Sequence, residues 1–238
     1  MADTPTPATL ICLPFAGAGA SFFHPWAERV PAGVRVLAIQ LPGRERLIDQ
    51  QPYRSVRDAA DGLLPELAKA ADAGTVLYGH SLGAVLAFEL ALRLCDLGLA
   101  PAGLIVGGSP GPWTRRRLRA TGLPDEEFVL RVADFAGYTH EALADPELRG
   151  LILPALRADV EMHENYRPPR DTPRLGIPLV SLRGADDALV TAGQAREWAE
   201  ATTGEFTYLE VPGGHMFPTA GPGPVLGALA RVGDGAAA

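Results

Sequence analysis

Residues 75–84 read Thr-Val-Leu-Tyr-Gly-His-Ser-Leu-Gly-Ala and contain a Gly-x-Ser-x-Gly motif centred on Ser81. An apolar run typical of a buried strand precedes the motif, and an apolar helical pattern follows it. This order is typical of a sharp strand-to-helix turn that holds a serine at strained backbone angles with its hydroxyl exposed. Gly79 and Gly83 are needed because a side chain at either position would collide with the neighbouring strand and helix. The segment predicts a nucleophilic serine, and a glycine-rich turn needed only for packing is the alternative.

Outward from this motif, short aliphatic runs alternate with longer helical patterns. Most of the short runs are apolar at successive positions, as expected for strands that are covered on both faces. Repetition of strand, helix and strand favours a mostly parallel sheet with helices on both faces, which is the α/β class. The expected strands are 9–13, 34–39, 75–78, 104–106, 179–182 and 206–211, and the expected helices are 55–71, 82–97 and 193–202.

The composition sets limits on the class of protein. The chain has 238 residues, of which 47% are hydrophobic and 21% charged, and we expect a single domain over residues 1–238. A net charge of −7 argues against a nucleic-acid partner, because duplex binding needs a dense cationic face. No apolar run reaches the roughly 18 residues of a membrane span, and no secretory signal is visible. We expect a soluble, cytoplasmic protein, and nothing in the sequence demands more than a monomer.

The strand–helix alternation breaks over residues 111–174, where no strand is expected. Two helical patterns occupy this segment. The first begins at the acidic run 125–127, which suits a helix N-terminus. The second is an apolar stripe over 148–160, and we expect Pro154 to kink or split it. A helical insertion between two strands is typical of a lid, and two ordinary crossover helices are the alternative.

A serine becomes a good nucleophile when a base removes its proton and an acid orients that base. In folds with this turn the partners follow in the order serine, acid, histidine. His215 lies in a loop after the last expected strand, and we interpret it as the base. His80 lies inside the motif and would point away from the Ser81 hydroxyl. The remaining histidines precede the serine or fall in the expected lid.

The acid is expected in the loop after strand 179–182, which reads Arg-Gly-Ala-Asp-Asp-Ala-Leu-Val over residues 183–190. Two adjacent carboxylates, Asp186 and Asp187, make the choice ambiguous. We favour Asp187 because the Gly-x-x-Asp-x-x-Val spacing puts it at the tip of the loop, whereas Asp186 would be solvated or would hold the loop. The candidate triad is therefore Ser81, Asp187 and His215.

The oxyanion hole is expected to use the backbone N–H of Leu82 and a second N–H from the loop after the first strand. Small residues in that loop let backbone donors approach a ligand oxygen closely, and Ala16 is our choice for the second donor. A glycine-rich turn after a first strand also opens dinucleotide-binding domains. That fingerprint needs glycine or alanine at position 22, but this sequence has Phe22 there. The interpretation of the turn as a dinucleotide-binding site therefore fails.

Short segments outside the serine motif match one known family. They are Leu-Pro-Phe-Ala-Gly at 13–17, Gln-Leu-Pro-Gly-Arg-Glu at 40–45, Leu-Pro-Asp-Glu-Glu-Phe at 123–128, Asp-Pro-Glu-Leu at 145–148, Leu-Arg-Ala-Asp at 156–159 and Gly-His at 214–215. Together with the motif at 79–84, they make the chain resemble the type II thioesterases of polyketide and nonribosomal-peptide assembly lines, which have the α/β-hydrolase fold. The segment at 41–45 is more telling than the serine motif, which every α/β hydrolase shares. One departure is Ala18-Gly19-Ala20, where the family more often has a second glycine directly after the first.

The resemblance implies hydrolysis of acyl groups from the phosphopantetheine thiol of acyl or peptidyl carrier proteins, as editing of stalled or misprimed chains. It implies no cofactor and no metal. Three alternatives stay open: a hydrolase of free esters or acyl-CoA thioesters, a product-releasing thioesterase, and a catalytically silent hydrolase-fold binding module. The sequence does not indicate the pathway, the carrier protein or the preferred acyl chain.

An arginine cluster and a set of apolar residues each have two possible roles. The cluster from Arg115 to Arg119 either steers an acidic carrier or its phosphate, or is a solvated arginine face, which is the simpler interpretation. We expect aromatic residues and methionines to line an acyl channel. Those that lie in the lid are explained equally well by core packing between the lid helices. The expected channel residues are Phe15, Phe128, Phe135, Tyr138, Met162, Tyr166 and Met216.

Overall fold

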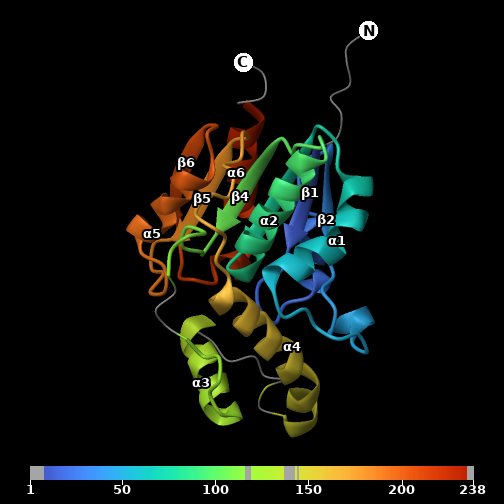
Figure 1. Cartoon of the computed structure of the whole chain (residues 1–238), viewed down its shortest axis with the longest axis vertical. Coiled ribbons are helices and arrows are strands. Elements are labelled where there is room, and N and C mark those ends of the chain that lie inside the picture. Colours follow the sequence, from blue (N-terminus) through green and yellow to red (C-terminus); the bar gives the residue numbers. More distant parts are fainter. Residues whose placement is uncertain (1–7, 116–118, 137–142, 144, 235–238) are drawn as a thin grey trace.

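The computed structural model describes residues 8–115, 119–136, 143 and 145–234, and its centre is a six-stranded sheet (Figure 1). Every pairing between the described strands is parallel, and the strand order is β2-β1-β3-β4-β5-β6. The predicted α/β architecture is confirmed. The strands are β1 (Ala8–Leu13), β2 (Val34–Ala38), β3 (Thr75–His80), β4 (Gly103–Gly107), β5 (Leu179–Gly184) and β6 (Phe206–Val211).

The strand order reverses at β1, which has β2 on one side and β3 on the other. The chain leaves β1 toward one edge of the sheet and returns on its other side to build the rest. Connections diverge at such a point, so a crevice opens outside the carboxyl ends of the two strands. Residues that follow β1 and β3 meet at this crevice, and Ser81 is the first residue after β3.

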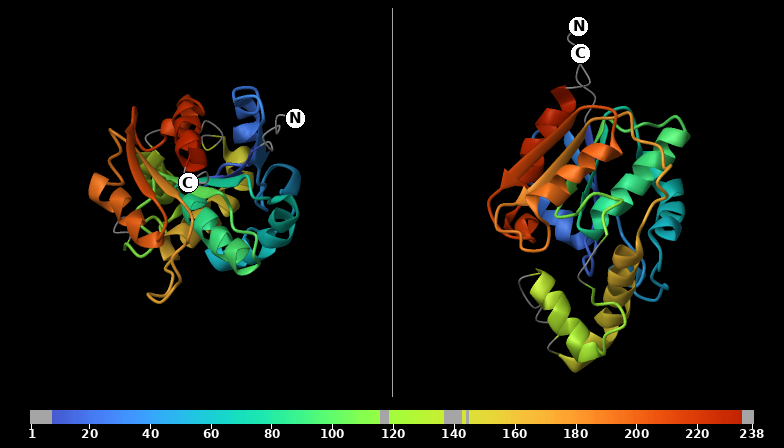
Figure 2. Two further views of the ribbon diagram at one scale, coloured as in Figure 1. Left: turned by 90° about the horizontal axis from the view of Figure 1, so that it is seen from above. Right: turned by 60° about the vertical axis from the view of Figure 1, so that its left-hand side comes forward.

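Helices cover both faces of the sheet (Figure 2). One face carries α1 (Val56–Ala70), α2 (Leu82–Asp96), α5 (Ala192–Arg196) and the short helix η4 (Glu197–Ala201). The other face carries η1 (Ala20–Trp26) and α6 (Gly223–Asp234). Each layer has its own apolar core against the sheet. Strands buried on both faces explain why successive residues of β3 and β4 are apolar.

Local sequence signals account for several helix ends. The Ser55 hydroxyl caps α1 by accepting from the Asp58 N–H, and Thr191 with Gln194 forms a capping box at the start of α5. The expected helix over 193–202 is in fact α5 followed by η4, because the chain tightens after Arg196. Helices η1 and α6 were not predicted. α6 begins at a Gly-Pro pair that reads as a loop, although Val225, Ala228 and Val232 form its buried stripe.

The insertion between β4 and β5 contains α3 (Asp125–Ala136) and α4 (Pro146–Asn165), which lie beyond the carboxyl ends of the strands (Figure 1). Of the expected kink or split at Pro154, the split does not occur, because α4 runs through Pro154 as one helix from Pro146 to Asn165. Pro154 and Gly150 are both exposed, so water can solvate the Gly150 carbonyl that loses its helical partner.

The two ends of α4 belong to different apolar clusters. Met162 and Tyr166, at its carboxyl end, pack into the core shared by α1, α2 and the sheet. Leu153, Leu156 and Val160 instead join a separate cluster with α3. The insertion is thus anchored to the sheet domain at one end and has its own small core at the other. No helix among the described residues is long and apolar enough to cross a membrane.

Candidate active site

Ser81 lies at the junction of β3 and α2 with backbone angles φ 54° and ψ −112°, which are strained for a residue with a side chain. Its N–H donates to the Gly107 carbonyl on β4 over 2.8 Å. A Cβ on Gly79 would lie 1.9 Å from the Gly83 carbonyl oxygen, and one on Gly83 would lie 2.3 Å from the Leu13 carbonyl oxygen. These contacts are with backbone atoms that cannot move away, so both glycines of the motif are required for the turn.

The loops after β5 and β6 bring an acid and a histidine together. His215 Nδ1 lies 3.0 Å from Asp187 Oδ2, within hydrogen-bond distance. The other carboxylate oxygen, Oδ1, accepts the N–H groups of Leu189 and Val190 over 2.8 and 3.0 Å. The loops approach closely at Gly184, where a Cβ would lie 2.2 Å from the Gly214 carbonyl oxygen. Of the two adjacent carboxylates, Asp187 is thus the one that contacts His215.

Asp187 is 4% exposed and faces the histidine, whereas Asp186 is exposed. Burial by itself would raise the pKa of Asp187, but the hydrogen bond and charge of His215, together with the N–H donors of Val190 and Leu189, outweigh it and lower the pKa. Asp187 is therefore a carboxylate at neutral pH. It can hold the His215 ring and stabilise a positive charge on it.

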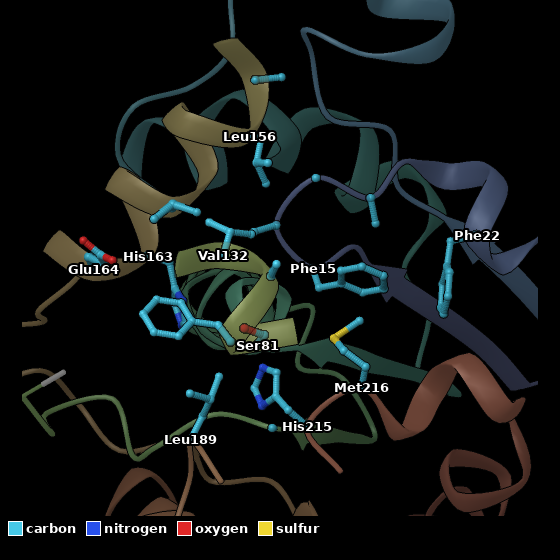
Figure 3. A pocket seen from close by; sticks show the side chains of 18 of the residues that line it. Phe15, Phe22, Ser81, Val132, Leu156, His163, Glu164, Leu189, His215 and Met216 are labelled. Carbon is cyan, nitrogen blue, oxygen red and sulfur yellow. The ribbon is translucent and has the colours of Figure 1, made fainter. Parts of the chain in front are cut away.

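Ser81 and His215 both line one large cavity, and both point into it in Figure 3. His80 packs behind them, with its ring against those of Phe15, His215 and Phe217. Burial, and next the neighbouring His215, lower the pKa of His80 well below its usual value, so this ring is neutral. His80 does not line the cavity, in agreement with the expectation that it points away from the serine hydroxyl.

The loop after β1 makes a tight turn at the cavity wall. The Ala18 N–H donates to the Phe15 carbonyl over 3.0 Å, and Gly17 has φ +80°, the conformation that a type II turn demands at its third residue. The Gly17 N–H is occupied, because it donates to Asp159 Oδ2 over 2.8 Å. The Ala16 N–H makes no hydrogen bond to any other described residue, and Ala16 lines the cavity. Leu82 opens α2, where helix N–H groups lack intrahelical partners.

The cavity has a volume of about 1600 Å³ and lies between the sheet domain and the insertion. Figure 3 shows Phe15, Phe22 and Met216 on one side of Ser81, and His163, Glu164 and Leu189 on the other. The apolar wall facing the serine comes from α3 and α4, and includes Val132 and Leu156.

The family model for the thioesterase domain matches residues 8–231. The chain belongs to the thioesterase family. This thioesterase is 38% identical over 210 residues to the probable cadicidin biosynthesis thioesterase of Streptomyces griseus, with 88% of this chain and 58% of that relative covered. The chain thus spans somewhat more than half the length of that relative.

Solved structures give the same answer. The type II thioesterase BorB from the borrelidin biosynthetic cluster is 38% identical and has a TM-score of 0.85, covering 96% of this chain and 93% of BorB. YbtT, a type II thioesterase from the yersiniabactin NRPS/PKS pathway, is 29% identical with a TM-score of 0.86, covering 99% and 95%. The expected resemblance to type II thioesterases is confirmed, and this thioesterase is a thioester hydrolase with the α/β-hydrolase fold.

The structure distributes the expected acyl-channel residues between the cavity and the core. Phe15, Phe135 and Met216 line the cavity. Tyr138, like residues 116–118 of the arginine cluster, lies outside the described residues.

Phe128, Met162 and Tyr166 were expected in the acyl channel but do not line the cavity. Phe128 is 1% exposed within the α3–α4 cluster, with the Arg157 guanidinium 4.2 Å from its ring centre. Met162 and Tyr166 are buried against α2, and the Tyr166 hydroxyl donates to Glu89 over 3.0 Å. Met162 and Tyr166 thus face the core of the sheet domain, whereas Phe128, on α3, faces the separate core of the insertion.

Several lining residues were missed by sequence reasoning. Phe22 reaches the cavity from η1, an element that was not predicted. Ile152, Leu156 and Val160 belong to the apolar stripe of α4, and their spacing of four residues could have marked them as one face over the site. Of the arginine cluster, Arg115 and Arg119 line the cavity, and Arg119 pairs with Glu164 over 3.4 Å.

Proposed function

We propose that this thioesterase hydrolyses acyl groups from the phosphopantetheine thiol of acyl or peptidyl carrier proteins, and thereby edits stalled or misprimed chains in a polyketide or nonribosomal-peptide pathway. Its relatives support the pathway class, because they include a probable biosynthesis thioesterase and a type II thioesterase from an NRPS/PKS pathway. Editing hydrolysis needs a site that accepts varied acyl groups together with a long thiol arm.

The observation that carries this proposal is the position of Ser81 and His215 part-way along a cavity of about 1600 Å³ (Figure 3). This volume exceeds the roughly 300–1,000 Å³ of a pocket for a drug-sized ligand. A thioester has two arms that leave the reacting carbonyl in opposite directions. Apolar side chains such as Phe22 and Met216 suit the acyl arm, and the opposite side, near Glu164, is more polar and suits a pantetheine arm with its amides.

In the proposed reaction, the Ser81 oxygen attacks the thioester carbonyl while His215 Nε2 takes the serine proton. Asp187 stabilises the positive ring, and the Ala16 and Leu82 N–H groups stabilise the oxyanion. The C–S bond then breaks, and the thiol leaves with the proton from His215. A thiol with a pKa near 8.5 is a better leaving group than an amine. Water, activated by His215, attacks the acyl-serine ester and releases the carboxylic acid.

The test is intact-mass analysis of a carrier protein loaded with acyl groups from acetyl to long chains, with Ser81→Ala as the control. We expect release that depends on Ser81 and is broad across short acyl groups. Equal cleavage of acyl-CoA and carrier-bound thioesters would contradict the carrier claim and leave a general thioesterase. Release restricted to one full-length product would favour a product-releasing enzyme instead. Failure of a fluorophosphonate probe to label Ser81 would favour a catalytically silent binding module.

A further inference from the structure

A buried ion pair joins the insertion to the loop after β2. The two guanidinium NH groups of Arg44 contact the two carboxylate oxygens of Asp159, at 2.5 and 2.8 Å. Arg44 belongs to the Leu-Pro-Gly-Arg-Glu segment that made the sequence resemble its family, and Asp159 lies on α4. The Asp159 side chain is 1% exposed and that of Arg44 is 9% exposed.

Both members of this pair also hold the turn that carries Ala16. Asp159 Oδ2 accepts the Gly17 N–H over 2.8 Å, and the Arg44 guanidinium donates to the Ala18 carbonyl over 3.1 Å. Further donation from Arg44 to the Pro42 carbonyl, at 3.3 Å, fixes the guanidinium to its own loop. Asp159 thus holds Gly17 as an acceptor and Arg44 holds Ala18 as a donor, while Ala16 lines the cavity.

Stability alone is a weak reason for such a pair. Removing two charges from water costs several kcal/mol per ion, and replacing a buried pair by apolar side chains of similar size is often neutral or stabilising. A buried pair that orients a catalytic backbone group has a different benefit, because an oxyanion donor acts only when it points at the developing charge.

We propose that Asp159, held in place by Arg44, is a positioning residue of the oxyanion hole: it fixes the Gly17 N–H and so keeps the Ala16 N–H aimed at the oxyanion. This inference rests on the proposed serine mechanism. It makes the position of α4 a requirement for catalysis as well as for closing the cavity, since the same helix carries Asp159 and the apolar wall around Leu156.

The decisive comparison uses two double variants that differ only in the acceptor for the Gly17 N–H. Arg44→Met with Asp159→Leu removes both charges and the acceptor. Arg44→Met with Asp159→Asn removes both charges and keeps an amide oxygen as acceptor. The assays are kcat and KM for a short p-nitrophenyl ester, the rate of Ser81 labelling by a fluorophosphonate, and thermal unfolding.

For the leucine variant we expect kcat and the labelling rate to fall together by roughly 10- to 100-fold, less than the 10²–10³ for a deleted oxyanion donor, with KM within about twofold. The asparagine variant should stay within about threefold of wild type. Equal losses in both variants, or none in either, would overturn the proposal. If the leucine variant does not fold, Asp159→Glu moves the acceptor by one methylene, and an unchanged kcat there would overturn the proposal.

Glu89→Gln is the matched control. Glu89 is also a buried carboxylate that pairs with an arginine, Arg93, and it accepts the hydroxyl of Tyr166 just after α4. It has no hydrogen bond to the turn, so stability should fall while kcat stays unchanged. The p-nitrophenyl and labelling assays need the oxyanion hole and no carrier protein. A loss in these assays without hydrolysis of carrier-bound acyl groups would therefore retain this inference and refute the proposed substrate.

Discussion

Replacing Asp187 by asparagine should nearly abolish catalysis while leaving the fold intact. Carboxylate oxygen Oδ1 accepts two backbone N–H groups, from Leu189 and Val190. The amide oxygen of asparagine will take that position, because an NH₂ group there would face two donors. The NH₂ group must then occupy the Oδ2 position and point at His215 Nδ1. Nδ1 becomes an acceptor, the ring proton moves to Nε2, and Nε2 can no longer take the proton of Ser81.

The size of the loss follows from that tautomer change. In the well-studied serine triad the same substitution lowers kcat by about 10⁴, and at about 1.36 kcal/mol per tenfold this is about 5.4 kcal/mol of transition-state stabilisation. We expect a similar factor here, because two N–H donors also fix the orientation of the amide in this protein. The assay is steady-state hydrolysis of a p-nitrophenyl ester and of an acylated carrier protein, with thermal unfolding as the check on folding.

Asp186→Asn is the control, because Asp186 is the adjacent, exposed carboxylate. Its kcat should stay close to that of wild type, because Asp187, and not Asp186, contacts His215. A folded Asp187→Asn variant that keeps more than a tenth of the activity would refute the tautomer argument. A collapse of activity in Asp186→Asn would move the acid by one residue along the loop.

Further predictions concern stability, specificity and pH. Gly79→Ala should destabilise the protein by about 3 kcal/mol or more, because the new Cβ would lie 1.9 Å from a backbone carbonyl oxygen of α2. Gly227→Ala should instead raise the free energy of unfolding in urea by about 0.5–1 kcal/mol, because Gly227 is an exposed helix residue and an added Cβ there would meet no atom outside its own helix within 4 Å. Phe128→Ala should lower the free energy of unfolding by about 3–5 kcal/mol, because it deletes a buried core side chain. Met216→Ala should raise KM for long acyl substrates with little change in the unfolding temperature, because Met216 lines the cavity. A raised KM in Phe128→Ala and an unchanged KM in Met216→Ala would place the acyl chain in the α3–α4 core. The Asp187 pKa is lowered in the folded protein, so its stabilising contribution is complete above the unfolded value of about 3.9 and is lost as pH falls through the folded pKa. The stability difference between wild type and Asp187→Asn should therefore shrink from pH 7 to pH 3.5, and a widening gap would contradict this sign.

Much of the fold was predictable because local patterns carried it. Buried parallel strands leave continuous apolar runs, and each of the six observed strands overlaps an expected one. Helix α6 escaped prediction because a Gly-Pro start hides an apolar stripe that has meaning only against the sheet. Of the kink or split expected at Pro154, the split did not occur, since solvent exposure of Gly150 lets water bind the carbonyl that loses its helical hydrogen bond.

Residue type and order along the chain determined the candidate nucleophile, base and first-choice acid. The two glycines around Ser81 mark a turn that no other residue fits, and the loops after successive parallel strands necessarily end at the same edge of the sheet. Tertiary structure alone decided which of two adjacent carboxylates faces His215, because that depends on how the loop turns by one residue.

The same holds for the surroundings of the serine. Only packing separates Phe15, which lines the cavity, from Phe128, which is buried in the α3–α4 cluster, because both are aromatic residues in suitable segments. Arg44 and Asp159 are 115 residues apart, and no local pattern links them. Neighbouring residues determine local features such as the turn at Ser81. Burial and pairing between distant segments arise only when the chain folds and brings α4 against the turn after β1.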